Sequence, residues 1–336
     1  MFIHEIFKNA DPKSLAMTGE SNVTYGQLEK AVENYRNTLY AMGIRRGDTV
    51  GLYTANRAEF VQVYMAVVSL GAIIVPINNS LVDREVDFIL RDAESKLLIS
   101  DMPLTVSVPF IDIHDLDYRA STENAPKAPA LPADLTEDDV CALIYTSGTT
   151  GSPKGAMITH KNQVRNVEQY TAVVRFKPED KVLCVLPMFH CYGLTTVVLG
   201  SLYHHSTIVI LRSKSPTEII NTIMKYSVTI AIMVPPLYNL LARRGEPSSM
   251  KTVHTFVSGG ASLPQPAAQF IERLRHTLGN AGAAGYKGLH RFHAAWIAAP
   301  GKQDVKRRHH NRTGDGVVHD RALLNILRCR RSAVDS

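Results

Sequence analysis

Short apolar runs that alternate with helix-compatible segments constrain the fold of this chain more than any other feature of its sequence. Each run is bounded by turn residues and has the length of a buried strand. The predicted strands are 50–53, 72–77, 140–146, 182–186, 207–211, 229–234 and 255–257. Apolar strands that alternate with helices are typical of parallel sheets covered on both faces. The sequence therefore predicts an α/β fold.

Helix boundaries can also be predicted locally. Thr24 and Gln27 have the spacing of a capping box, and apolar residues follow at helical intervals until Gly43. We therefore expect a helix that ends at this glycine. Other helix-compatible segments cover 57–70, 162–173 and 216–225.

Positive charge is concentrated at the C-terminal end of the chain. Residues 274–336 contain 12 Lys and Arg against 4 Asp and Glu, a net charge of +8, whereas residues 1–273 carry 25 against 27, a net −2. The charge of the body gives no reason to expect a nucleic acid partner. A Pro- and Ala-rich linker is predicted over 121–134, before the strand that ends at Thr146.

The sequence gives no support for a membrane-spanning protein or for a protein with a structural metal site. The uncharged segment 60–81 is divided by Gly71 and Pro76, so it predicts a helix and a strand and no transmembrane span. The four cysteines have neither CxxC nor Cys/His ligand spacing, which predicts no structural metal site. No secretory segment is recognisable, so we expect a reducing, cytoplasmic location.

The segment YTSGTTGSPKG, residues 145–155, follows the predicted strand 140–146. Glycines let the backbone approach a phosphate closely, the hydroxyls of Ser and Thr add donors, and Lys154 adds a positive charge. In open α/β sheets ligands bind at the carboxyl ends of strands, where this loop is expected. The glycine spacing does not match a Walker A motif. The pattern predicts a polyphosphate site, with a solvated turn as the alternative.

With the flanking residues, YTSGTTGSPKGAMITH resembles the phosphate loop of the adenylate-forming, AMP-binding superfamily, and more nearly that of acyl-CoA synthetases, the fatty-acid and related carboxylate–CoA ligases. Six further motifs agree in family order over about 240 residues: TYGQL, GIRRGDTV, GAIIVPIN, LPMFHCYGL, VPPLY and VSGGASLP. The resemblance implies an N-terminal adenylation domain made of stacked α/β subdomains with mostly parallel sheets.

The resemblance also implies a reaction and its substrates. A carboxylate, expected to be a fatty acid, attacks the α-phosphate of ATP and releases pyrophosphate, and the thiol of CoA then displaces AMP. ATP, Mg²⁺ and CoA are the implied cofactors. The implied residues for the β- and γ-phosphates are Thr146, Ser147, Gly148, Thr149, Thr150, Gly151 and Lys154.

The acyl and adenylate pocket is implied to contain His190 and the turn formed by Ser258, Gly259, Gly260 and Ala261. A core histidine bonded to backbone is the alternative for His190. Cys191, its neighbour, could be read as a thiol nucleophile, but the implied mechanism uses the thiol of CoA.

The resemblance stops near residue 273. The family continues with a glycine-tyrosine-glycine turn and a Thr-Glu pair whose Glu serves magnesium; here GYKGLH, residues 285–290, has no Thr-Glu after it. The triplet 313–315 spells the family's ribose-binding Thr-Gly-Asp, but it lies only 55 residues after Ser258. The C-terminal domain and its adenylation lysine are expected to be absent, so the family's catalytic groups are not found.

We therefore expect a partial AMP-binding domain over 1–273 and an aberrant, poorly ordered basic tail over 274–336. Codons permitted for 298–320, read one nucleotide later, allow PPPGNKTLKAGIITGPAMELSM, which resembles the family's next segment. A frameshifted or truncated coding sequence is the hypothesis, and a diverged natural tail is the alternative. The predicted function is an impaired or inactive acyl-CoA synthetase. The alternatives are a noncatalytic nucleotide- or acyl-binding remnant and a tail that binds nucleic acid.

Overall fold

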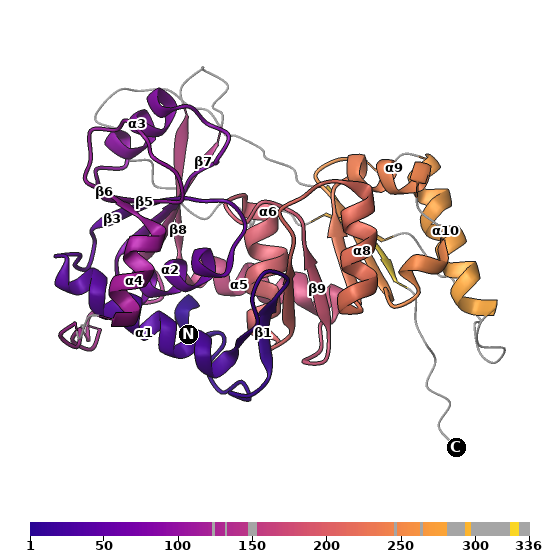
Figure 1. The fold of residues 1–336 in the computed structure, drawn as a ribbon, viewed down its shortest axis with the longest axis horizontal. Coiled ribbons are helices and arrows are strands. Elements are labelled where there is room, and N and C mark those ends of the chain that lie inside the picture. The colour runs from indigo at the N-terminus through magenta and orange to yellow at the C-terminus, as the bar shows by residue number, and fades with distance from the viewer. Residues whose placement is uncertain are drawn as a thin grey trace.

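The computed structural model describes residues 1–122, 125–131, 133–146, 153–244, 247–262, 265–280, 293–296 and 323–328. Within this part of the chain the strands form two sheets, one with six strands and one with eight. Figure 1 shows the six-stranded sheet with its indigo and magenta helices beside the eight-stranded sheet, whose later elements are orange. The predicted α/β class with stacked, mostly parallel sheets is confirmed.

The six-stranded sheet is parallel except at one edge. Across the sheet its strands are β6 (Phe110–Asp112), β5 (Ser95–Ser100), β3 (Thr49–Tyr53), β4 (Ile73–Pro76), β7 (Val140–Thr146) and β8 (Lys154–Thr159). Only β8 runs antiparallel to its neighbour, β7. The carboxyl ends of the five parallel strands therefore lie at the same edge of the sheet.

The eight-stranded sheet has a parallel centre with antiparallel strands outside it. Its order is β13 (His293–Trp296), β14 (Leu323–Arg328), β12 (Thr255–Gly259), β11 (Ile230–Met233), β9 (Lys181–Cys184), β10 (Thr207–Ile210), β1 (Leu15–Thr18) and β2 (Val23–Thr24). Strands β12, β11, β9, β10 and β1 are parallel to one another. Strand β14 pairs with β12 in antiparallel register, and β13 pairs with β14.

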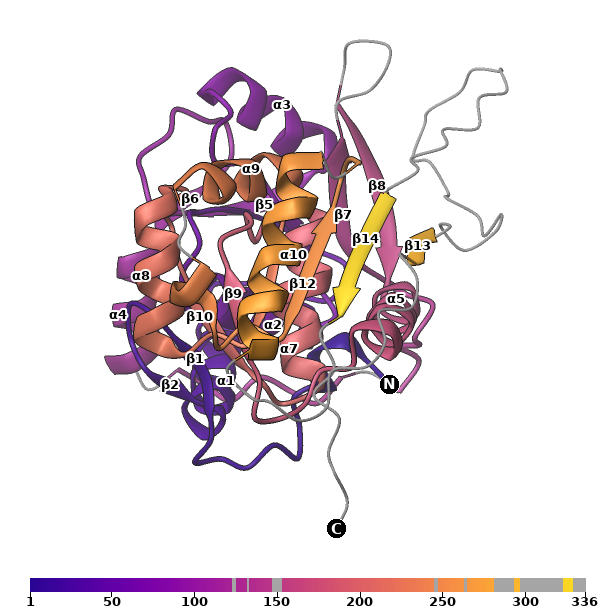
Figure 2. The same cartoon turned by 90° about the vertical axis from the view of Figure 1, so that its right-hand side faces the viewer.

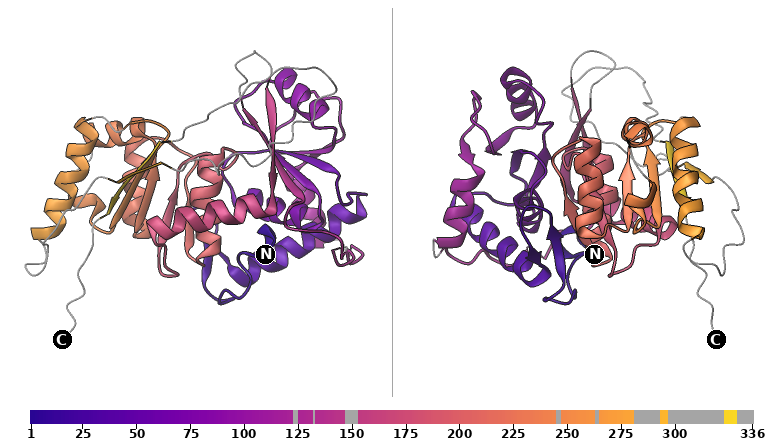
Figure 3. Two further views of the ribbon diagram at one scale, coloured as in Figure 1. Left: turned by 180° about the vertical axis from the view of Figure 1, so that it is seen from behind. Right: turned by 45° about the vertical axis from the view of Figure 1, so that its right-hand side comes forward.

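Helices cover both sheets, and the two views of Figure 3 show them between and outside the strands. They are α1 (Tyr25–Ala41), α2 (Ala58–Ser69), α3 (Asp83–Asp92), α4 (Ile113–Thr122), α5 (His160–Val174), α6 (Cys191–Gly193), α7 (Gly200–Tyr203), α8 (Pro216–Tyr226), α9 (Pro235–Arg244) and α10 (Gln265–Asn280). Shorter turns are η1 (Ile3–Glu5), η2 (Leu194–Leu199, a π-helix) and η3 (Pro247–Met250).

Helix α1 begins and ends as its sequence predicts. The Thr24 hydroxyl accepts a hydrogen bond from the Gln27 N–H at 3.2 Å, and the Gln27 side chain accepts one from the Thr24 N–H at 2.8 Å. Such a cap contributes about 1 kcal/mol. Gly43, at φ +92°, turns the chain after the helix in a conformation that favours glycine.

Helix α2 is buried along almost its whole length. Every residue of it except Glu59 is buried, and its apolar side chains belong to a core cluster that also contains residues of β3, β7, β9 and β11. Because a helix that is apolar on all sides must be covered on all sides, α2 lies where both sheets contribute to one core. No described helix is both long and apolar enough to cross a membrane.

The predicted linker over 121–134 is held against α1 in its described part. Ser121 and Thr122 belong to helix α4. The Arg36 guanidinium donates to the carbonyls of Ala128, at 3.1 Å, and Pro129, while the Asn37 Oδ1 accepts from the Ala128 N–H at 2.9 Å. These contacts give the segment a fixed path over the helix.

Helix α10 continues past residue 273 and ends at Asn280. In Figure 2 it lies in front of β12, with α9 beside it. Residues 281–292, 297–322 and 329–336 lie outside the described residues, and with them GYKGLH, the triplet 313–315 and Cys329. The domain boundary at 273 and the aberrant character of the tail stay predictions.

Candidate functional site

The polyphosphate loop predicted from the sequence connects β7 to β8. Thr146, at the carboxyl end of β7, is paired with Lys154, the first residue of β8. Thr146 is exposed and Lys154 is partly buried. The other predicted members, Ser147, Gly148, Thr149, Thr150 and Gly151, lie outside the described residues. The hairpin therefore fixes where the loop starts and where its lysine lies.

Tyr145 and Gly155 form the next pair of this hairpin. A Cβ atom added to Gly155 would meet the Tyr145 ring at 3.0 to 3.2 Å, so glycine leaves room for the ring. The Tyr145 hydroxyl donates to Asp92 Oδ2 at 2.6 Å. Burial and this contact with the Asp92 carboxylate raise the pKa of Tyr145 above its usual value. The phenol stays protonated and holds the base of the loop to α3.

The second set of predicted residues lies on the eight-stranded sheet. Strands β9, β11 and β12 are parallel neighbours, so the segments that follow them meet at one edge. These segments are LPMFH after β9, VPP after β11, and the end of VSGGA at β12. Three motifs that are far apart in the sequence are thus brought together, as expected for a pocket at the carboxyl ends of parallel strands.

His190 is exposed at the start of α6. Its Nδ1 accepts a hydrogen bond from the Tyr192 N–H at 3.1 Å, so Nδ1 carries no proton and the imidazole caps the short helix. Cys191 Sγ lies 3.8 Å from the same nitrogen. The histidine is bonded to backbone, as the alternative interpretation holds, but it lies at the surface and not in the core.

Ser258, the last residue but one of β12, has a buried hydroxyl in an unusual state. The residue is only 2% exposed, and Oγ has no hydrogen-bond partner among the described residues. A buried polar group without a partner costs free energy, so such groups are often found at functional sites.

Gly259 is buried beside Ser258, while Gly260 and Ala261 are exposed. Gly260 has φ +86°, a conformation that favours glycine. A Cβ atom added to Gly260 would lie 3.8 Å from its nearest neighbour, Val234 Cγ1, so the backbone angle and not lack of space selects glycine. The turn passes directly over the end of β11.

Two residues at these edges were missed in the sequence. Asn56, after the end of β3, donates from its side chain to the Leu186 carbonyl at 2.8 Å and accepts from the Met188 N–H at 2.8 Å. Tyr192 has a buried hydroxyl without a partner among the described residues, and burial raises its pKa. The only signal for Asn56 was its position just after a predicted strand, whereas Tyr192 follows His190 in a motif already recognised.

No group of three or more His, Cys, Asp or Glu side chains that could hold a metal ion occurs in the described part of the chain. The sequence motif GYKGLH, where the family's magnesium carboxylate would follow, lies outside it. The described residues thus place the predicted phosphate residues at one sheet edge and the predicted pocket residues at another.

Two curated relatives match about three quarters of this chain. A 4-coumarate–CoA ligase of Arabidopsis thaliana is 30% identical over 278 residues, covering 76% of this chain and 49% of the relative. The long-chain-fatty-acid–CoA ligase FadD13 of Mycobacterium tuberculosis is 30% identical over 259 residues, covering 72% of this chain and 51% of the relative. The chain thus spans about half the length of the curated relatives it matches.

Solved structures match the fold. The N-terminal domain of FACL13 from Mycobacterium tuberculosis superposes with a TM-score of 0.73 and 28% identity over 81% of this chain and 73% of that one. ATP-bound MatB from Rhodopseudomonas palustris has a TM-score of 0.72 and 27% identity over 81% of this chain and 58% of its own. The family model for AMP-binding enzymes matches residues 6–286, and the chain therefore belongs to the AMP-binding, adenylate-forming family that includes CoA ligases.

Proposed function

We propose that this chain binds ATP at the loop between β7 and β8 and a carboxylic acid at the β9, β11 and β12 edge, as the substrate-binding half of an ATP-dependent acyl-CoA synthetase. The observation that carries the proposal is that the predicted phosphate loop follows β7, and that the LPMFH, VPP and SGGA segments lie at the carboxyl ends of β9, β11 and β12. The similarity to the ATP-bound structure of MatB supports ATP as the nucleotide.

The proposed reaction joins two anions. A carboxylate oxygen bonds to the α-phosphorus of ATP, and the bond from that phosphorus to the pyrophosphate oxygen breaks. Lys154 neutralises phosphate charge, while Thr146 and the backbone of the loop donate hydrogen bonds. The His190 and Ser258–Ala261 segments form the wall that orients the carboxylate. Mg²⁺ would add positive charge at the phosphates, and the thiol of CoA would then displace AMP.

A fatty acid is the proposed carboxylic acid, which the similarity to FadD13 supports. The 4-coumarate–CoA ligase, equally identical to this chain, makes an aromatic acid the comparison substrate. A titration that measures pyrophosphate release with long-chain fatty acids and with 4-coumarate tests the choice. A larger kcat/KM for the aromatic acid would overturn the fatty acid assignment.

Complete turnover to acyl-CoA is proposed to be low, because no Thr-Glu pair follows GYKGLH in the sequence. The same observation favours a second candidate function, a noncatalytic remnant that binds nucleotide or acid. ATP binding, pyrophosphate release and acyl-CoA formation should therefore be measured on the same sample. Binding without pyrophosphate release supports the remnant, and robust acyl-CoA formation contradicts the proposed impairment.

The phosphate site itself is tested by the variant Lys154→Ala. We expect ATP affinity to fall at least about tenfold, because a charge-assisted hydrogen bond contributes about 1.5–3 kcal/mol. Lys161→Ala is the matched control, since Lys161 is a partly exposed lysine at the start of α5 that pairs with Asp138 at 3.1 Å. Equal ATP affinity in both variants and the parent chain would show that ATP does not bind at this loop.

A further inference from the structure

The segment from Val185 to His190 belongs to no helix or strand, although it connects the centre of the eight-stranded sheet to α6. Its buried backbone groups must find partners elsewhere. Leu186 and Met188 are both almost fully buried. Within the segment the His190 N–H donates to the Pro187 carbonyl at 3.2 Å. The Leu186 carbonyl and the Met188 N–H are bonded from outside, by a residue in the loop that follows β3 of the other sheet.

That residue is Asn56. Its Nδ2 donates to the Leu186 carbonyl at 2.8 Å, and its Oδ1 accepts from the Met188 N–H at 2.8 Å. These two groups flank Pro187, as the carbonyl of residue i−1 and the N–H of residue i+1 do when a parallel strand pairs with residue i. One side-chain amide therefore takes the place of a missing neighbouring strand.

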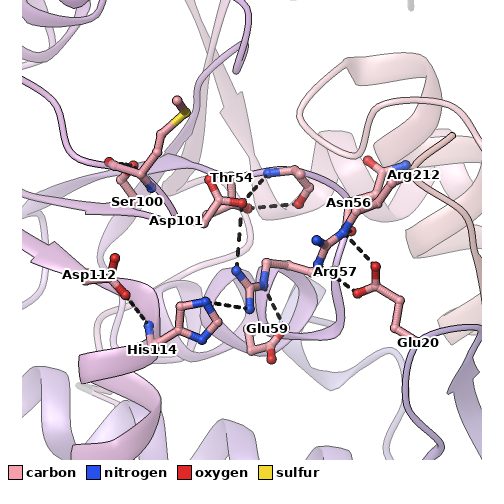
Figure 4. A network of polar contacts seen from close by, with 12 residues as sticks. Glu20, Thr54, Asn56, Arg57, Glu59, Ser100, Asp101, Asp112, His114 and Arg212 are labelled. Atoms are coloured by element: carbon pink, nitrogen blue, oxygen red, sulfur yellow. Dashed lines mark hydrogen bonds and ion pairs between the residues drawn. The ribbon is translucent and has the colours of Figure 1, made fainter.

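Charged groups on both sides hold Asn56 in place, as Figure 4 shows. Its own carbonyl accepts from Arg212 Nε at 3.0 Å, and Arg212 pairs with Glu20. On the other side Arg57, which is almost fully buried, donates to Glu59 at 2.9 Å and lies 3.7 Å from Asp101.

Asp101 also accepts from the Ala55 N–H at 2.9 Å. The backbone on both sides of Asn56 is thus fixed, and its side chain is 8% exposed. A side chain held in this way loses little conformational freedom when it bonds the LPMFH segment.

The position of the Pro187 peptide determines the position of His190. Its carbonyl accepts the His190 N–H, and a Cβ on Gly193 would lie 2.2 Å from the same oxygen. The turn is therefore closely packed on itself, and a shift at Pro187 would move His190. We propose that Asn56 is a positioning residue for the acid side of the site, acting from the six-stranded sheet through the LPMFH segment. Its effect on substrate rests on the proposed function.

The chemistry of the amide supplies the test. Asn56→Asp keeps the shape and the acceptor but removes the donor and turns a carboxylate oxygen toward the Leu186 carbonyl. Asn56→Gln keeps both groups on a longer stem. Asn37→Asp is the matched control, because Asn37 uses Oδ1 to accept from the Ala128 N–H, and a carboxylate can do the same.

Hydrogen exchange read by mass spectrometry over residues 185–193 tests the positioning without any substrate. We expect Asn56→Asp to raise exchange in this peptide at least about tenfold. Asn56→Gln should raise it less, and Asn37→Asp should leave it unchanged. Unchanged exchange in Asn56→Asp would overturn the proposal. If that variant does not fold, a rise in exchange confined to this peptide in Asn56→Gln supports it, and no rise overturns it.

The effect of the Asn56 variants on KM for the acid is measured by pyrophosphate release. We expect Asn56→Asp to raise KM for the acid about tenfold and KM for ATP less than about twofold. An equal rise in KM for the acid and for ATP would indicate a general structural role and overturn the assignment. Absence of acid-dependent release in the parent chain would contradict the proposed function instead, and the exchange measurement would still decide on Asn56.

Discussion

The two sheet edges proposed to bind the substrates, called here the phosphate edge and the acid edge, are built in opposite ways. The phosphate edge is one hairpin, in which Thr146 and Lys154 are close in sequence and paired in space. The acid edge is assembled from segments near residues 190, 234 and 258, and a side chain from residue 56 holds one of them. A local site tolerates change in the rest of the fold, whereas an assembled site depends on the packing of both sheets.

The largest effect that tests this difference is expected for Gly193→Ala at the acid edge. The new Cβ would lie 2.2 Å from the Pro187 carbonyl oxygen, a backbone atom that cannot move away independently. We expect a loss of about 3 kcal/mol in the free energy of unfolding, measured with urea. Gly200→Ala is the control, since its nearest neighbours are at 3.4 to 3.5 Å and helical alanine is favoured. Equal midpoints for the two variants would contradict the close packing of the turn.

Acid should loosen the start of α5, at the end of the β7–β8 hairpin opposite Thr146 and Lys154, before it loosens the edge formed by β9, β11 and β12. Burial lowers the pKa of His4 and of His160 to about 4, and His160 Nδ1 accepts from the Ile3 N–H at 3.3 Å. Both are neutral when folded and take up protons near pH 6.5 when unfolded. The contribution of the two neutral histidines to the free energy of unfolding is complete above pH 6.5 and is lost as pH falls toward 4. One such histidine changes stability by at most about 1.4 kcal/mol per pH unit.

Urea unfolding at pH 7, 6, 5 and 4.5, with hydrogen exchange over 154–170 and 185–193, measures this effect. His160→Gln keeps an acceptor for Ile3 and should flatten the acid slope. A parent chain whose stability is constant from pH 7 to 4.5 would contradict the buried neutral histidines.

A smaller effect is expected for Gly155→Ala at the phosphate edge. The added Cβ would meet a side-chain ring at 3.0 Å, and the ring is held by its 2.6 Å bond to Asp92. We expect a cost of about 1 kcal/mol in thermal or urea unfolding. Tyr145→Phe releases the ring, so the cost of Gly155→Ala should shrink in that background. An undiminished cost in the double variant would show that the ring does not limit the substitution.

The smallest effect is expected for Ser258→Ala. Because the buried Oγ has no partner among the described residues, its removal should leave the free energy of unfolding unchanged or raise it by up to about 1 kcal/mol. Thr18→Val is the contrasting variant, since the Thr18 hydroxyl donates to Asn22 at 2.6 Å and its loss should destabilise. A large loss in Ser258→Ala would reveal a hydrogen-bond partner for Oγ outside the described residues.

Several elements were predicted accurately from local signals. Strand β7 has the predicted bounds, and α8 differs from its prediction by one residue. The capping box at Thr24 is present as expected. The region over 121–134 was predicted less well, because its path depends on contacts with Arg36 and Asn37 on α1. Such contacts join residues about ninety positions apart and leave no periodicity in the sequence.

The sequence by itself determined the alternation of strands and helices, the family and the two ends of the phosphate loop, because each depends on neighbouring residues. Only the tertiary structure decided that LPMFH, VPP and SGGA share one edge, since strand order is set by packing and not by chain order. It also decided the role proposed for Asn56. An amide that replaces a missing strand is recognisable only when the unpaired peptide groups it satisfies are beside it in space.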